Sequence, residues 1–89
     1  DYITFLHDGE LVLSACKDEL IYQYGIMKCR EEDFKQLDPD AIIRYRKQPY
    51  ETVVLVADRK AAAHNYPNCI VERATLDDIM LLYVKGERI

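Results

Sequence analysis

The sequence predicts a small α/β protein of the α+β class, in which an N-terminal β-hairpin precedes a β-α-β-α-β-α sandwich with helices packed on a mixed sheet. Short runs of β-branched and aromatic residues predict the strands, and capped segments with helical apolar spacing alternate with them. Turn residues separate these segments, and no internal repeat or low-complexity linker interrupts them. A chain of 89 residues makes one small domain at most.

The first expected element is the hairpin. Residues 2–6 and 11–13 are strand formers and almost wholly apolar, and Asp8-Gly9 between them favours a tight turn with positive φ at both central residues. Apolar runs without alternation suit strands covered on both faces, and a chain of this size has little to cover them. The sequence also lacks an initiator Met and begins one residue before a strand, not in a polar linker. We therefore expect a piece of a longer protein, in which a further domain covers the hairpin.

A short helix is expected over residues 17–24, with Gly25 as its C-terminal cap. A strand over residues 26–30 follows, with partial alternation of apolar and polar side chains. Gly25 is the expected joint between a terminal hairpin-and-helix unit, residues 1–25, and an extension domain, residues 26–89.

Two helix starts are expected in the next segment. Acidic residues at 31–33 favour the first because negative charge complements the helix dipole. Asp38-Pro39 predicts the second, with Asp as N-cap and Pro at the first helical position. Apolar residues through Tyr45 extend this second helix until Gln48-Pro49 ends it.

The strongest strand signal is residues 52–56, TVVLV, which predicts a central strand buried on both faces. Asp58 caps the helix expected over residues 59–66, and residues 69–73 form another strand. Thr75 caps the last helix, with Asp78 as a capping-box partner, and Gly86 ends it. The expected buried stripe of this helix is Leu76, Ile79, Met80 and Tyr83.

Composition argues against several classes of protein. The chain has 12 basic and 16 acidic residues and a net charge of −4, whereas a nucleic-acid binder needs clustered Lys and Arg. The short basic clusters at 44–47 and 59–60 are interpreted as solvated helix faces. No segment approaches the roughly 18 apolar residues that cross a bilayer, and no signal peptide is evident. The three cysteines, Cys16, Cys29 and Cys69, lack metal-ligand spacing and suggest buried thiols in a reducing cytosol.

Residues 1–20, DYITFLHDGELVLSACKDEL, resemble the last hairpin of an ABC transporter ATP-binding subunit. In that family an Asp/Tyr/Ile-type strand, a Gly turn, a Leu-Val return strand and a Glu-Leu helix close the nucleotide-binding domain. The match covers about residues 1–25, and the remainder looks like the C-terminal extension of a subgroup that includes many bacterial exporters. Residues 75–81, TLDDIML, are similar to the helix that often ends such extensions.

The resemblance implies a parent protein that binds ATP and Mg²⁺ and couples ATP hydrolysis to transport. Its expected partners are a membrane permease subunit and a second ATP-binding subunit. The expected location is the cytoplasmic face of the cell membrane, held there through the permease without membrane insertion of this chain. No nucleic-acid partner is expected.

The chain itself lacks the catalytic motifs of that family. Lys follows none of its three glycines, it has no Gly-Gly pair for a signature loop, and Arg59 stands after the strand ending at Asp58 where a catalytic Glu would be needed. His7 and His64 are expected on the surface. We therefore expect no catalytic residue, no cofactor site and no metal site within this chain, which would have a structural, regulatory or subunit-contact role.

Seven tyrosines and the apolar hairpin suggest an interface, including a homo-oligomer of this chain. The proposed contact residues are Tyr2, Phe5, Leu11, Leu13, Tyr45 and Tyr83. The alternative for the tyrosines is amphipathic packing at the edge of the core, with the ring buried and the hydroxyl in water. The alternative function is a free-standing α/β regulatory module that binds a small ligand at a dimer interface.

Overall fold

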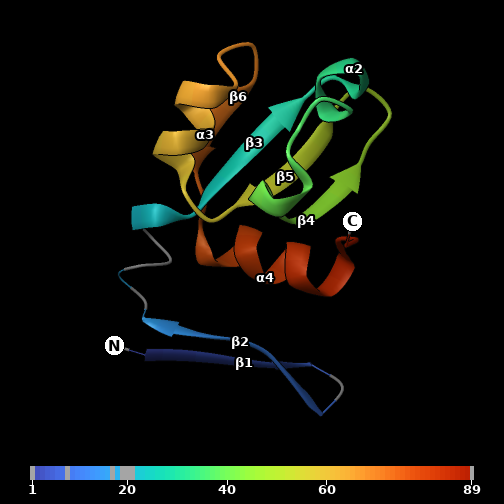
Figure 1. Ribbon diagram of the computed structural model, residues 1–89. Helices are drawn as coiled ribbons and strands as arrows, with labels where there is room; N and C mark the ends of the chain where they lie inside the picture. The colour runs from blue at the N-terminus through green and yellow to red at the C-terminus, as the bar shows by residue number, and fades with distance from the viewer. Residues whose placement is uncertain (1, 8, 17, 19–21, 89) are drawn as a thin grey trace.

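Two antiparallel sheets organise the computed structural model, which describes residues 2–7, 9–16, 18 and 22–88 (Figure 1). One is a hairpin of β1 (Tyr2–His7) and β2 (Glu10–Cys16). The other has the order β4-β5-β3-β6, and its strands are β3 (Gly25–Cys29), β4 (Ile42–Lys47), β5 (Thr52–Val56) and β6 (Ile70–Arg73). The α+β class is confirmed. The expectation of a mixed sheet is wrong, because all three strand pairs of this sheet are antiparallel.

The helices lie on both faces of the larger sheet. They are α2 (Glu31–Phe34), the 3₁₀ turn η1 (Pro39–Ala41), α3 (Arg59–Asn65) and α4 (Leu76–Lys85). Alternate strand residues point to opposite faces, so Leu55 joins a core cluster with Ile79 of α4, whereas Val54 joins a second cluster with Ala62 of α3. Residues 52–56 therefore form an interior strand buried on both faces, as expected.

The predicted hairpin is confirmed. Gly9 has a φ of +77°, as the turn requires, while Asp8 lies outside the described residues. The structure describes the side chains of Tyr2, Ile3, Thr4, Leu6 and Cys16 within the two strands. Ile3 packs against the α4 cluster, and Figure 1 shows the hairpin running beside α4. The helix expected over residues 17–24 lies largely outside the described residues, although Asp18, Tyr22 and Gln23 are helical.

The helix expected from Asp38 to Gln48 is wrong beyond its first turn. Asp38 does cap η1, since its Oδ1 accepts a hydrogen bond from the Asp40 amide at 3.0 Å. The chain then becomes β4 and pairs with β5, and the Gln48 amide donates to the Glu51 carbonyl at 2.8 Å across the turn. Residues 42–45 include two β-branched residues and a Tyr, which favour a strand once a pairing partner is available.

In α4 the predicted capping box is present, and one part of the predicted stripe is wrong. The Thr75 hydroxyl accepts a hydrogen bond from the Asp78 amide, and the Asp78 carboxylate accepts one from the Thr75 amide. Ile79 is fully buried and Leu82 is 3% exposed, whereas Met80 is 40% exposed. The helix thus turns the i, i+3 pair Ile79 and Leu82 toward the sheet, and Met80 lies at the margin of the contact.

Replacing Ile79 by Ala should lower the free energy of unfolding by about 2–5 kcal/mol, because a fully buried side chain leaves a cavity between α4 and the sheet. Met80→Ala is the matched control and should cost less than about 1 kcal/mol because that side chain is partly in water. Urea unfolding followed by circular dichroism measures both. Equal losses for the two variants would contradict this orientation of α4.

Candidate functional site: a charged cleft beside the last helix

A cleft of about 300 Å³ lies on the α4 side of the larger sheet. Its lining comes from all four strands, from the turn between β4 and β5, and from α4; the residues are Ile26, Lys28, Arg46, Gln48, Glu51, Val53, Glu72, Asp78, Leu81 and Leu82. Register explains the grouping, because Val53 pairs with Lys28 on one side and with Arg46 on the other. The side chains opposite each other on one face of a sheet are neighbours.

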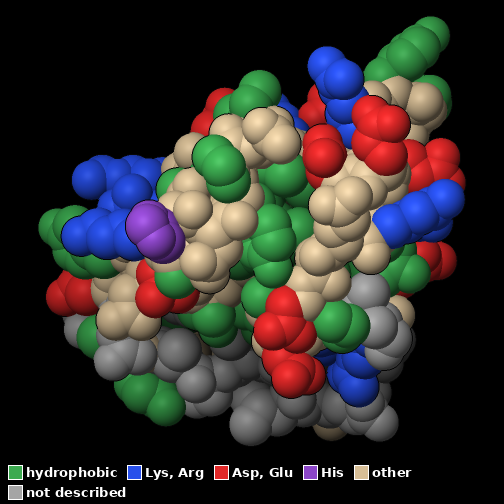
Figure 2. Space-filling model, turned by 45° about the horizontal axis from the view of Figure 1, so that its top comes forward, with side chains coloured by type: hydrophobic (Ala, Val, Ile, Leu, Met, Phe, Trp, Pro, Cys, Tyr) green, Lys and Arg blue, Asp and Glu red, His purple; other side chains and the backbone are tan. Residues whose placement is uncertain are grey.

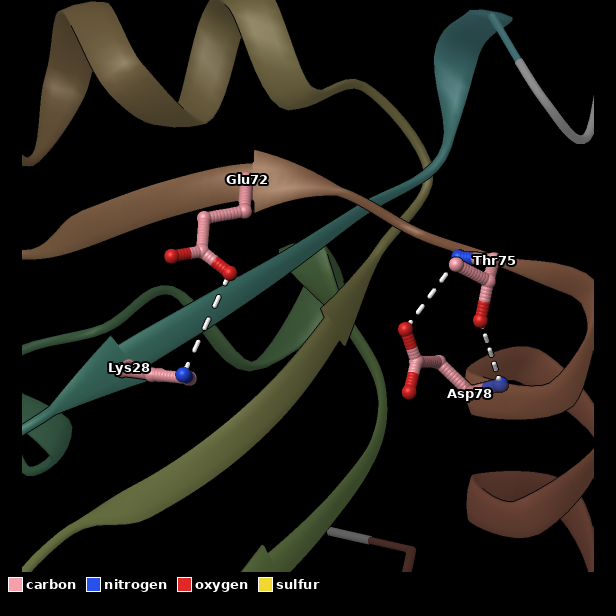
Figure 3. A network of polar contacts seen from close by, with 4 residues as sticks. All are labelled: Lys28, Glu72, Thr75 and Asp78. Carbon is pink, nitrogen blue, oxygen red and sulfur yellow. Dashed lines mark hydrogen bonds and ion pairs between the residues drawn. The ribbon is translucent and has the colours of Figure 1, made fainter.

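Charges of both signs meet in the cleft. Lys28 Nζ lies 3.9 Å from Glu72 Oε2, between side chains that are 39% and 57% exposed (Figure 3). An ion pair this exposed adds little to stability, so both groups can turn to another partner at small cost. Asp78 is committed to the capping box with Thr75, which Figure 3 shows at the start of α4. The described lining contains no His, Cys or Ser.

The structure separates the predicted interface residues that it describes. Tyr2 is 70% exposed on the hairpin. Tyr45 is half-buried, with its ring 4.9 Å from the Phe34 ring in the α3-side cluster. Tyr83 is half-buried in the α4-side cluster, where the Arg44 guanidinium lies 4.8 Å from its ring centre. Tyr45 and Tyr83 therefore contribute to opposite faces of the sheet. The side chains of Phe5, Leu11 and Leu13 lie outside those described.

The basic cluster at 44–47 lies on a strand and not on the expected helix. Arg44 is half-buried, and its Nη1 donates to the Ile43 carbonyl at 2.7 Å. Burial lowers the pKa of Arg44, with Arg88 as a second cause. Arg46 lines the cleft, while Lys47 points to the opposite face, where its Nζ lies 5.6 Å from the Phe34 ring centre. The strand therefore divides this cluster between two faces. Figure 2 shows both charge signs interspersed over the visible face of the molecule.

The cleft was not predicted from the sequence, although its charged residues give a weak signal there. Lys28, Arg46 and Glu72 are charged residues on three strands, at positions that line the cleft. These residues converge only because of the order of the strands in the sheet, and local sequence patterns do not predict that order. His64 is exposed on α3, as expected, while the His7 side chain lies outside those described.

Within the described part of the chain, no three His, Cys, Asp or Glu side chains are grouped to hold a metal ion. None of the helices formed by these residues has both the length and the apolar composition needed to cross a membrane. Comparisons of the chain with protein-family models, with curated proteins and with solved structures find no match.

Two buried groups keep their protons to unusually high pH. Burial raises the pKa of Cys29 from its ordinary value of 9.0 to about 12, with further contributions from the neighbouring Cys69 thiol and Asp33. Burial likewise raises the pKa of Tyr83 from 10.0 to about 12, with charge and hydrogen-bonding contributions from Tyr24 that Arg44 partly opposes. In the unfolded chain both groups would ionise near their ordinary values.

The protein should therefore lose stability as pH rises from about 9 to about 12. The folded state holds two protons that the unfolded state releases in this interval, so the stabilisation is complete below pH 9.0 and falls above it. We expect a loss of about 1–3 kcal/mol by about pH 11, measured by urea unfolding in the presence of a thiol reductant. Tyr83→Phe should remove the part of this loss that Tyr83 contributes. An unchanged dependence of the free energy of unfolding on pH would contradict the assignment.

Proposed function

We propose that this chain is the C-terminal part of an ABC transporter ATP-binding subunit and acts there in structural, regulatory or subunit contacts. The observation that supports this is the resemblance of residues 1–20 to the end of such a nucleotide-binding domain, in a segment that forms the expected strand–turn–strand hairpin. The similar segment at 75–81 begins a capped helix near the end of the chain. In this proposal ATP and Mg²⁺ bind to the preceding part of the parent protein.

The outward side of the hairpin supports a contact role. Ile3 packs inward on the α4 cluster, whereas Tyr2 and Leu6 on the opposite side of β1 are 70% and 64% exposed. Exposed apolar surface of this kind typically marks an interface. The proposed cover in the parent is the nucleotide-binding domain, which in turn contacts the permease and a second ATP-binding subunit at the cytoplasmic face of the membrane.

The reading frame that precedes the codon for Asp1 tests the proposal directly. It should encode a Gly-Lys-Ser/Thr loop, a Ser-Gly-Gly loop and an Asp-Glu pair, because phosphate binding and hydrolysis require them. The 89-residue chain alone should then show no heat of ATP·Mg²⁺ binding in calorimetry. A start codon directly before Asp1, or ATP binding by the isolated chain, would contradict the proposal.

The isolated chain should self-associate as its concentration rises, because its exposed hairpin side chains find cover on another copy. Size-exclusion chromatography with light scattering should show a dimer or larger species. The double variant Tyr2→Ser, Leu6→Ser should remain monomeric. Tyr50→Ser is the matched control, since Tyr50 is 95% exposed at a turn outside the hairpin and its loss should leave association unchanged. A monomer at every concentration would contradict the contact role of this surface.

A free-standing regulatory module is the second candidate, and the cleft is the observation that favours it. Its volume of about 300 Å³ is at the lower end of ligand pockets. Its lining includes Lys28, Arg46, Glu51 and Glu72, and charges of both signs suit a small zwitterionic ligand. The same upstream reading frame separates the two candidates, because a module of this class would need no nucleotide-binding motifs before it.

A further inference from the structure

Two of the three cysteines lie at the same end of the β3–β6 strand pair. In the antiparallel pair of β3 and β6, Gly25 is opposite Arg73 and Lys28 is opposite Ile70. Continued by one residue beyond this last pair, the register would bring Cys29 at the end of β3 opposite Cys69, which lies in the bend directly before β6. Opposed residues in antiparallel strands have Cα atoms about 4.5 or 5.5 Å apart, and disulfides need about 4.4–6.8 Å. Either kind of cross-strand pair therefore fits a disulfide.

A second observation, on the side chains, agrees with the register. Cys29 and Cys69 belong to the same apolar cluster on the α3 side of the sheet. Cys69 also contributes to the raised pKa of Cys29, which agrees with the two thiols being neighbours in this cluster. Both cysteines are free thiols in this structure.

The two thiols differ in access. Cys29 is 3% exposed, whereas Cys69 is half-buried and lines a hollow of about 190 Å³ beside the turn that precedes β6. The Cys69 amide donates to the Tyr66 carbonyl at 3.1 Å, which fixes that turn. A small oxidant can therefore reach Cys69 first, with Cys29 directly behind it.

We propose that Cys29 and Cys69 form a reversible disulfide that responds to hydroperoxides. The Cys69 sulfur attacks the terminal oxygen of the hydroperoxide, the O–O bond breaks, and water or an alcohol leaves with the displaced oxygen. Cys69 is then a sulfenic acid. The Cys29 sulfur, on losing its proton, attacks Cys69 Sγ, and the S–O bond breaks to release water. The two thiols thus give two electrons to one hydroperoxide, and a dithiol restores them by exchange.

The disulfide would join the interior strand β3 to the edge strand β6. It closes the chain segment that contains β4, β5 and α3. A cross-link over a segment this long restricts the unfolded chain strongly. Oxidation therefore fixes the β6 edge of the sheet, and reduction releases it. This site is independent of the proposed transporter role.

The test uses the full chain treated with stoichiometric hydrogen peroxide, then blocked with N-ethylmaleimide and digested with trypsin. Mass spectrometry should find the Cys29 and Cys69 peptides joined within monomers, with two hydrogens lost, and with dithiothreitol restoring the thiols. The midpoint of thermal unfolding should rise by about 10 °C on oxidation. Cys16→Ser is the matched control and should oxidise like the wild type.

Cys69→Ser should abolish the linked peptide and the rise in midpoint, and circular dichroism checks that this variant is folded. If it is not folded, Cys69→Ala provides the same comparison. The proposal is overturned if Cys69 accumulates as sulfinic acid without a link to Cys29. It is also overturned if the oxidised thiols join only between chains, or if oxidation leaves the midpoint of the Cys16→Ser variant unchanged.

Discussion

The pairing of β3 with β5 is the constraint on which the rest of the structure depends. Five consecutive residue pairs join these two interior strands, and their side chains point alternately to two faces. Val54 and Leu55 are both fully buried, one on each face. Neither face can remain in water, so α3 must cover one and α4 the other. Gly25 contributes at the start of β3, because a Cβ there would collide with Arg59 at the start of α3.

Incomplete cover by α4 produces the candidate site. Ile79 and Leu82 meet the sheet over Ile26 and Leu55, but the face continues beyond the helix into the region of Lys28. The strands place charged side chains there, among them Lys28, Arg46 and Glu72. Ile3 of the hairpin packs against the cluster that α4 forms with the sheet, and Figure 1 shows α4 between the sheet and the hairpin. This sheet face therefore supports a core and a cleft, and α4 joins it to the hairpin.

Local signals predicted the helix caps and the strand with the longest β-branched run. Asp58 and Thr75 cap their helices as expected, and residues 52–56 form the expected interior strand. The segment 42–47 was predicted wrongly because the helix start before it is real but lasts one turn, after which β5 supplies a pairing partner. That partner is non-local, and intrinsic preferences yield to it.

The candidate sites depend still more on non-local order. The cleft needs four strands in the sequence β4-β5-β3-β6, and the Cys29–Cys69 pair needs the register of β3 against β6. Spacing along the chain contains neither fact. The sequence suggested only buried thiols for the cysteines and a solvated helix face for residues 44–47, since both interpretations ignore the strand opposite.

The two edges of the larger sheet differ in their backbone pairing, and the cysteine pair lies at the edge that has less of it. At the β4 edge, Tyr45 exchanges two backbone hydrogen bonds with Glu87, of 3.0 and 2.7 Å. Gly86 allows the chain to turn from α4 back to β4, because a Cβ at this position would collide with the Leu82 carbonyl. Among the described residues no segment pairs with the outer side of β6, and Ile70 at its start is 60% exposed. An unpaired edge opens more easily than an interior strand. A covalent link from Cys69 to β3 would therefore strengthen the edge of the sheet that has the fewest backbone hydrogen bonds.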